Sequence, residues 1–371
     1  MGQSGLVVDA PLPGEFVMPR IRLDGGQLTA GQLRAIGSVA RRYARDNVEV
    51  TDQQHVRLGQ VRIEDAPEAF TRLRAAGLAA SPAGEHDAQQ VFLGSPVAGI
   101  AADEIVDGTP ALRAIRDRRS GRAEFSGLPR TFRTVISGSP RQDVLHEAGD
   151  VSFVGVRHPA LGPGFDIWVG GGLPANLVMA SRLGAFAAPR EVADVWAAVV
   201  RAFRDYGYGR SRRDASLKSL IADWGVERFR HVVETEYLHR RLAGCLAPPA
   251  PAGPRDQVGV HVQRDGRCYV GITPLAARPG GATLVALADL AAAHGSARVR
   301  ATPYRKFILL DIPPGRVESL CHGLERIGLT ARPALSRRCA LARARVKIAE
   351  SGSHVLVPVR DLAGDPWPGR R

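Results

Sequence analysis

Cysteine is scarce in this chain: only four of the 371 residues are cysteines, and they lie far apart. The separations are 23, 53 and 18 residues, so no Cys-x-x-Cys pair occurs; the positions are Cys245, Cys268, Cys321 and Cys339. This spacing argues against a disulfide-stapled secreted fold, because such folds are short and dense in cysteine. We expect four ordinary thiols and no metal site.

Long hydrophobic runs are also missing. Apolar stretches such as Val195–Val200 fall well short of the roughly 18 residues that a membrane crossing needs. The opening sequence, MGQSGLVVDAPLPGEF, lacks the basic and apolar regions of a signal peptide. We therefore expect a cytoplasmic protein that does not engage a membrane, and we expect it to be a monomer.

Acidic residues are too few to balance the basic ones, and the formal net charge is +13. The excess is concentrated near the end, where nine basic residues face three acids between Arg332 and Arg371. One interpretation is an acidic partner or nucleic acid; the other is an arginine-rich composition bias. Nucleic acid is the weaker hypothesis, because no aromatic residues are interleaved with the charges.

The chain contains an internal repeat. A shift of 251 residues aligns two segments without a gap, and each segment reads as helix, strand-turn-strand and second helix closed by Gly-Leu. Such a half cannot cover its own sheet, so we expect the two copies to pair about a pseudo-twofold axis. The matched positions are Leu33, Ile36, Val48, Thr51, Leu73, Gly77, Leu78 and Pro82 with Leu284, Leu287, Val299, Thr302, Leu324, Gly328, Leu329 and Pro333.

The segment between the copies has a different character. It has a glycine-rich centre, GPGFDIWVGGG at Gly162–Gly172, and a helical back over Arg190–Leu242. The proline-rich string LAPPAPAGP that follows it reads as a linker, since proline blocks a helix and stiffens the chain.

Several strings together resemble the ferredoxin-dependent siroheme sulfite and nitrite reductases, most closely their actinobacterial type. The resemblance runs from about Phe16 to Arg337, and its most specific strings are WVGGGL and RDYGY. The others are RIEDAPEAFTRLRAAGL, LGSPVAGI, LPRTFRTVISG, FVGVRHPALGPGFDIWVGGGL and SLKSLIADWG.

The resemblance implies an α+β fold. Two ferredoxin-like half-domains would flank a central siroheme-type α/β domain, and the family's C-terminal cofactor domain would be missing. The expected ranges are 1–85 for the first half-domain, 86–245 for the central domain, 246–256 for the linker, 257–336 for the second half-domain and 337–371 for a basic, disordered tail.

The resemblance also implies an oxidoreductase that reduces a small anion, sulfite or nitrite. Electrons would come from ferredoxin, an acidic donor, and pass through a 4Fe-4S cluster to siroheme. Basic side chains around the haem face hold the anion, which requires positive charge preorganised toward an oxyanion.

At the four family positions that carry these cations, the sequence departs from the pattern. Gln53 and Gln90 stand where the family has arginine, Thr131 stands where it has lysine, and only Arg133 keeps a cation, in place of a second lysine. Gln53 and His55 belong to the string TDQQH, Thr51–His55, where the family has the motif Thr-x-Arg-x-Asn, so His55 stands in place of the asparagine. Losing one preorganised donor typically costs on the order of 10²–10³ in rate, and three such losses cost more, so we expect no measurable reduction of sulfite or nitrite.

The cluster ligands depart as well. The family supplies four cysteines after the second half-domain, because iron in these clusters is held by thiolate. Only Cys339 lies in that region here, so we expect no 4Fe-4S cluster in this chain. The divergent end is either a natural new tail or the product of a shifted reading frame.

Some cofactor-binding positions survive. The resemblance assigns Arg130 to a macrocycle carboxylate, and the glycine loop to close backbone approach at Gly162, Gly164, Gly170, Gly171 and Gly172. A surface arginine and ordinary tight turns are the competing interpretations. Two functions therefore stay open: a sulfite or nitrite reductase, or a non-catalytic relative that retains macrocycle or acidic-partner binding.

Overall fold

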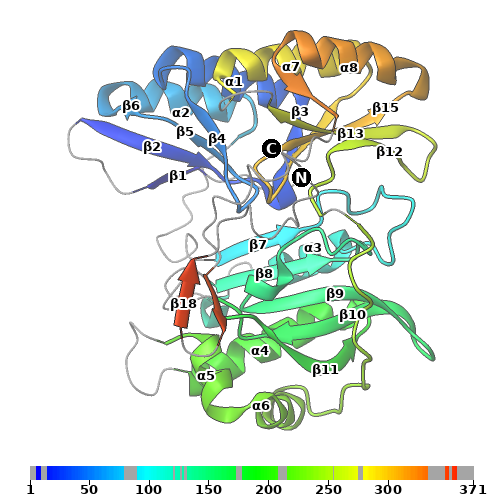
Figure 1. The fold of residues 1–371 in the computed structure, drawn as a ribbon. Helices are drawn as coiled ribbons and strands as arrows, with labels where there is room; N and C mark the ends of the chain where they lie inside the picture. The colour runs from blue at the N-terminus through cyan, green and yellow to red at the C-terminus, as the bar shows by residue number, and fades with distance from the viewer. Residues whose placement is uncertain are drawn as a thin grey trace, which may run out of the picture.

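The chain forms two helix-covered sheets stacked on a third, central sheet (Figure 1). The structure is a computed structural model. It describes residues 6–9, 15–78, 90–119, 122–125, 128, 132–172, 178–207, 215–253, 255–274, 279–332, 347–350 and 353–356. Helices α1, α2, α7 and α8 form one outer layer, the two half-domain sheets lie beneath them, and the central domain lies below these sheets.

The first half-domain builds the sheet β1-β2-β5-β4, with β6 added beside β2. Its strands are β1 (Leu6–Asp9), β2 (Phe16–Ile21), β4 (Val48–Val50), β5 (Val56–Leu58) and β6 (Val61–Arg62), and its helices are α1 (Ala30–Tyr43) and α2 (Ala66–Ala75). Helix α1 begins at a capping box, in which Thr29 and Gln32 satisfy each other's backbone N–H groups.

The second half-domain repeats this order. Its strands are β12 (Gly259–Val262), β13 (Cys268–Pro274), β14 (Arg298–Ala301), β15 (Phe307–Ile312) and β16 (Leu329–Thr330), and its helices are α7 (Gly281–Ala293) and α8 (Val317–Arg326). The sheet runs β12-β13-β15-β14-β3, and its last strand, β3 (Gln27–Thr29), comes from the first half-domain.

The pseudo-twofold pairing predicted from the repeat is confirmed. Ala30 N–H donates to Ala297 O at 2.9 Å, and its equivalent Gly281 N–H donates to Asp46 O at 3.3 Å. The antiparallel pair Arg298–Thr29 likewise has its mate in the bridge Asn47–Gly280. Because every one of these partners is 251 positions from its counterpart, each repeat lends the other the same backbone groups.

The turns at Thr51 and Thr302 are also equivalent. Thr51 N–H donates to His55 O at 2.8 Å, and Thr302 N–H donates to Lys306 O at 2.9 Å. Both threonine hydroxyls accept from the N–H four residues on, at 3.2 Å in each case. Both turns use a left-handed residue, at Gln54 and at Arg305.

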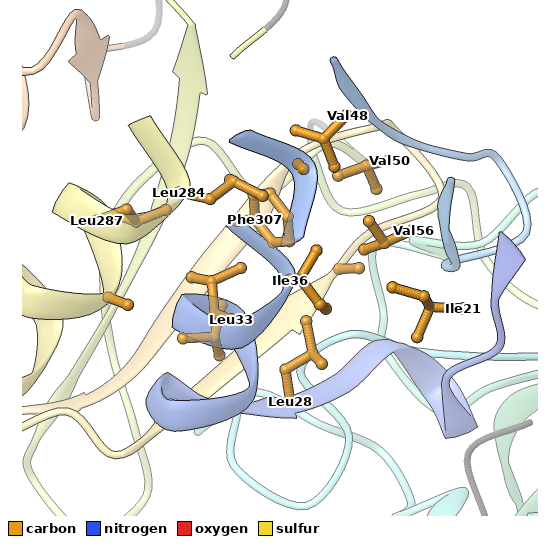
Figure 2. Close-up of a cluster of buried hydrophobic side chains, with 14 of the residues drawn as sticks. Ile21, Leu28, Leu33, Ile36, Val48, Val50, Val56, Leu284, Leu287 and Phe307 are labelled. Carbon is orange, nitrogen blue, oxygen red and sulfur yellow. The ribbon is translucent and has the colours of Figure 1, made fainter. Parts of the chain in front are cut away.

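One hydrophobic core serves both repeats. Leu33 and Ile36 of α1 pack in the same cluster as Leu284 and Leu287 of α7 and Phe307 of β15 (Figure 2). All five are at most 4% exposed. Burial of each such side chain stabilises the folded protein by about 1.5–3 kcal/mol. Separating the two repeats would expose this shared core, so each repeat depends on the other for stability.

The central domain is a five-stranded mixed sheet of order β11-β10-β9-β8-β7. Its strands are β7 (Gln90–Gly94), β8 (Phe132–Ser137), β9 (Val151–His158), β10 (Gly162–Val169) and β11 (Ser181–Ala187). Its helices are α3 (Thr109–Arg119), α4 (Val192–Tyr206), α5 (Leu217–Trp224) and α6 (Val226–Val232), followed by a π-helical turn over Val233–Tyr237. Trp196 of α4 is buried and donates to Thr134 of β8 at 2.9 Å.

The predicted tail contains one element that the sequence did not indicate. Strands β17 (Lys347–Glu350) and β18 (Ser353–Leu356) form an antiparallel hairpin. The rest of 337–371, including Cys339, lies outside the described residues, so its expected disorder stays a prediction. None of the helices in the described part of the chain combines the length and apolar character that crossing a membrane demands.

Glycine at the α1–α7 crossing gives a stability prediction. A methyl group at Gly37 would lie 2.6 Å from Gly281 O, so Gly37→Ala should force the helices apart and destabilise the fold by about 1–3 kcal/mol. Gly31→Ala, on the exposed side of the same helix, should instead stabilise by about 0.5–1 kcal/mol. Urea unfolding measures both; effects of the same sign would contradict the close crossing.

Candidate functional site

The string TDQQH, Thr51–His55, forms the turn between β4 and β5, at the junction of the three sheets. Gln54 is fully buried there; its Oε1 accepts from Gly94 N–H of β7 at 3.0 Å, and its Nε2 donates to Ala301 O of β14 at 3.3 Å. Gln53 beside it is half-buried, and its Oε1 accepts from Arg20 Nη1 at 3.1 Å. The turn thus joins both half-domains to the central sheet and presents Gln53 at the junction.

His55, at the position of the asparagine in the family motif, acts as a hydrogen-bond acceptor. Its Nδ1 accepts from Leu23 N–H at 3.1 Å, and the side chain is buried. Burial, together with the nearby charges of Arg22, Arg20 and Arg116, lowers the pKa of His55 to about 3. The imidazole is therefore neutral at physiological pH and adds no charge for an anion.

The Gln90 side chain points into the protein interior. Only 1% of it is exposed; its Nε2 donates to Phe125 O, and its Oε1 accepts from Arg119 Nη1 at 3.3 Å. Its backbone carbonyl accepts from Arg22 Nη2 at 2.6 Å. The amide is thus hydrogen-bonded on both sides inside the protein and adds no charge at this position.

Arginines that the resemblance did not single out gather around these two glutamines. Arg20 and Arg22 come from the β2 segment, and Arg116 and Arg119 come from the last turn of α3, where both stack on Phe92 at 5.9 and 5.3 Å. The sequence signals were the alternation of PRIR, which puts both side chains on one face of a strand, and the three-residue spacing on a helix.

Arg133, the one retained cation, lies on β8. Its backbone N–H donates to Asp150 Oδ2 at 2.8 Å, and its Nη1 lies 3.4 Å from Ala148 O. Its Nε is buried and has no hydrogen-bond partner among the described residues. Burial raises the pKa of Asp150 to about 6, while Arg133 and Lys218 act in the opposite direction.

The strand register separates Gln90 from Arg133. In the parallel β7–β8 pair, Gln90 lies opposite Phe132, and Val91 lies opposite Arg133. Residues directly opposite each other share a face, so Gln90 faces helices α3 and α4, whereas Arg133 lies on the other face with Val91. Gln90 and Arg133 thus lie on opposite faces of the central sheet, whereas Thr131 lies outside the described residues.

The predicted glycine loop also divides in two. Gly162 and Gly164 belong to the β9–β10 hairpin, and a methyl group at Gly164 would meet the Phe186 ring at 2.3 Å. Gly170, Gly171 and Gly172 lie beyond the far end of β10, roughly 25 Å away at about 3.3 Å per residue.

Only the far end of the loop lies near the retained cation. Gly171 N–H donates to Gly149 O at 2.9 Å, next to the Ala148 carbonyl that lies near Arg133. A methyl group at Gly172 would lie 3.1 Å from Lys218 Cδ. This end is the one that fits an anionic ligand; Arg130, predicted to bind the same ligand, lies outside the described residues.

The described cysteines do not form a cluster site. Cys268 and Cys321 pack against the core of the half-domains, whereas Cys245 lies beside the Asp166–Arg182 pair at the far edge of the central sheet. Within the described ranges, no group of three or more His, Cys, Asp or Glu side chains is placed to hold a metal. A 4Fe-4S cluster does not fit these three thiols, because four thiolates must converge on it.

His55 predicts a pH dependence of stability. Its folded pKa of about 3 lies below the unfolded value near 6.5, so the unfolded chain binds the extra proton between these values and stability falls as the pH drops through this window. The slope for one proton is about 1.4 kcal/mol per pH unit. His55→Asn, which keeps an acceptor for Leu23, should flatten the curve measured by urea unfolding between pH 6.5 and 4. Parallel curves for the two proteins would show that His55 is not the group responsible.

Two family models match the chain. The nitrite/sulfite reductase ferredoxin-like half domain matches residues 11–76 and 261–327, and the nitrite and sulphite reductase 4Fe-4S domain matches residues 88–242. These segments coincide with the two repeats and the central sheet domain described above.

Proteins similar in sequence to this chain are named as sulfite and nitrite reductases. The chain is 46% identical over 331 residues to a sulfite reductase (ferredoxin) of Mycobacterium tuberculosis, which covers 89% of this chain and 59% of the relative. It is 34% identical over 303 residues to a ferredoxin–nitrite reductase of Leptolyngbya laminosa, covering 79% and 58%.

A solved structure supports the same relationship. The Mycobacterium tuberculosis NirA protein superposes with a TM-score of 0.80 at 45% identity, over 88% of this chain and 59% of that one. The chain thus spans about three-fifths of the length of these relatives. With both half-domains and the central domain in place, the chain belongs to the ferredoxin-dependent sulfite/nitrite reductase family.

Proposed function

We propose that the chain binds a siroheme-type macrocycle and a small oxyanion, and that these 371 residues by themselves do not reduce sulfite or nitrite. The observation that carries the binding part is the orphaned Nε of Arg133, a buried cationic donor without a partner among the described residues. An unpaired buried donor is costly, and an anionic group bound beside it would remove that cost.

The chain's own residues set the electrostatics of this place. Arg133 and Lys218 supply positive charge beside the backbone of Gly170–Gly172, which suits the carboxylates of siroheme or a small anion. Asp150, whose pKa is raised by burial to about 6, gains and loses its proton close to Arg133 near pH 6. Siroheme, when bound, supplies the redox-active iron.

The absence of reduction is proposed on two grounds. Gln53 and Gln90 carry no charge at positions where the resemblance places arginine, and the Gln90 amide already bonds to Phe125 and Arg119. The three described cysteines are divided between the half-domain core and the edge of the central sheet, so they do not supply the four converging thiolates of an electron relay.

The second candidate is an active reductase with ferredoxin as its donor. It is favoured by the 45–46% identity to mycobacterial sulfite reductases and by the conserved arrangement of three domains. Under this candidate only Cys339 could contribute a thiolate from outside the described ranges, and the others would have to come from outside these 371 residues. Sulfite and nitrite are both small anions and would meet the same Arg133 donor, so the proposal covers both.

The binding part is tested by titrating the purified chain with siroheme and following its visible absorption. Arg133→Ala should weaken binding about tenfold, since a charge-assisted hydrogen bond contributes roughly 1.5–3 kcal/mol. Arg113→Ala, an exposed arginine on α3, is the matched control and should leave binding unchanged. Equal affinities for the wild-type chain and Arg133→Ala would remove the basis of the assignment.

A further inference from the structure

An open groove of about 550 Å³ is lined by residues of α7, α8 and the turns beside them. These two helices belong to the outer helix layer, which lies away from the central domain (Figure 1). Leu290 and His294 of the α7 end form one wall, and Glu318, Ser319 and His322 of α8 form the other. Gly323 lies against Leu290 between these walls and adds no side chain to fill the space.

The first repeat has the same place, but there it is occupied. Arg72, which is 251 positions before Gly323, lies across α2 toward α1; its Nε donates to Tyr43 OH at 3.0 Å and to Glu68 Oε1 at 3.1 Å. Its guanidinium also lies 5.9 Å from the centre of the Tyr43 ring. The first repeat therefore displays a guanidinium bound between an aromatic ring and a carboxylate.

We call the ring and the acceptor side chains that surround a guanidinium at this place a cradle; Tyr43 and Glu68 form the first cradle. The groove of the second repeat has residues at the equivalent positions but no guanidinium between them. Position 294, equivalent to Tyr43, is the ring of His294, and position 319, equivalent to Glu68, is Ser319. The His294 Nε2–Ser319 Oγ distance is 3.0 Å, so the ring again bonds to the second helix. Glu318, one residue earlier, supplies the carboxylate at the groove wall.

The hydrogen-bond chemistry selects a donor as the ligand. His294 Nδ1 lies 2.8 Å from Leu290 O. Because a carbonyl only accepts, Nδ1 carries the proton and Nε2 of the neutral ring accepts from the Ser319 hydroxyl. The oxygen lone pairs of Ser319 and the Glu318 carboxylate are then left as acceptors, which match a guanidinium and not an anion.

The residues that surround the guanidinium position also have the same net charge in the two repeats. Without Arg72, the first cradle holds Glu68 and Arg42, whose side chains approach to 3.9 Å. The second holds Glu318 and Arg326. Each cradle is therefore neutral before a guanidinium arrives.

We propose that the α7–α8 groove is a binding site for an arginine side chain presented by a partner protein. The guanidinium stacks on the His294 ring and donates to Glu318 and Ser319, in the way that Arg72 is held in the first repeat. Stacking on a flat ring and a forked set of donors distinguish arginine from lysine at such a site.

The test is a titration of the full chain with N-acetylarginine methylamide, followed by the NMR signals of the His294 and His322 rings. Saturable binding of one equivalent is expected, with N-acetyllysine methylamide at least about tenfold weaker. Glu318→Gln should weaken arginine binding about tenfold. Glu325→Gln on the same helix, whose carboxylate instead pairs with Arg332 at 3.2 Å, should leave it unchanged.

Two further variants use the repeat itself. Arg72→Ala should empty the first cradle and raise the stoichiometry from one equivalent to two. The double change Leu290→Val with Gly323→Arg copies the first repeat and should abolish binding at the groove; the valine relieves the 2.5 Å approach that a side chain at 323 makes to Leu290. The proposal is overturned if the lysine probe binds equally well, if Glu318→Gln has no effect, or if Arg72→Ala leaves one site.

Discussion

The crossed exchange of backbone hydrogen bonds between the repeats is the constraint on which the rest of the structure depends. The N–H of Ala30 bonds to Ala297 O and that of Gly281 bonds to Asp46 O, so α1 and α7 each begin against the segment that leads into a strand of the other repeat. This exchange fixes the helix crossing at Gly37 and Gly281 and gives both sheets one core. The Thr51–His55 turn of the first repeat lies against the central sheet. There the Gln54 side chain bonds to Gly94 of the central sheet and to Ala301 of the second repeat.

The same backbone frame accommodates the neutral residues at the candidate site. Gln53 accepts from Arg20, and the buried Gln90 amide is hydrogen-bonded to Arg119 and to Phe125 O. His55 accepts the Leu23 N–H bond in its neutral form. The architecture is retained because backbone pairing and packing hold it, whereas function depends on charges that packing does not require.

The sequence predicted the architecture well because the repeat is a local pattern copied at a constant offset, as the Thr51 and Thr302 turns illustrate. It did not reveal that Gln90 and Arg133 face opposite sides of the sheet, since that follows from the β7–β8 register, which no local pattern carries. The same holds for the distance between Gly164 and Gly171, which one β10 strand separates. The arginines around the glutamines were missed because they meet through long-range contacts.

The central claim is that this chain has the family's architecture but not its thiolate cluster, and iron and acid-labile sulfide analysis after anaerobic reconstitution tests it most directly. Of the three described cysteines, Cys268 and Cys321 pack in the half-domain core and Cys245 lies at the edge of the central sheet. Only Cys339 stands near a family ligand position in sequence. The account predicts no stoichiometric sulfide and no iron beyond that of a bound haem. About four irons and four sulfides per chain, as a 4Fe-4S cluster requires, would contradict it.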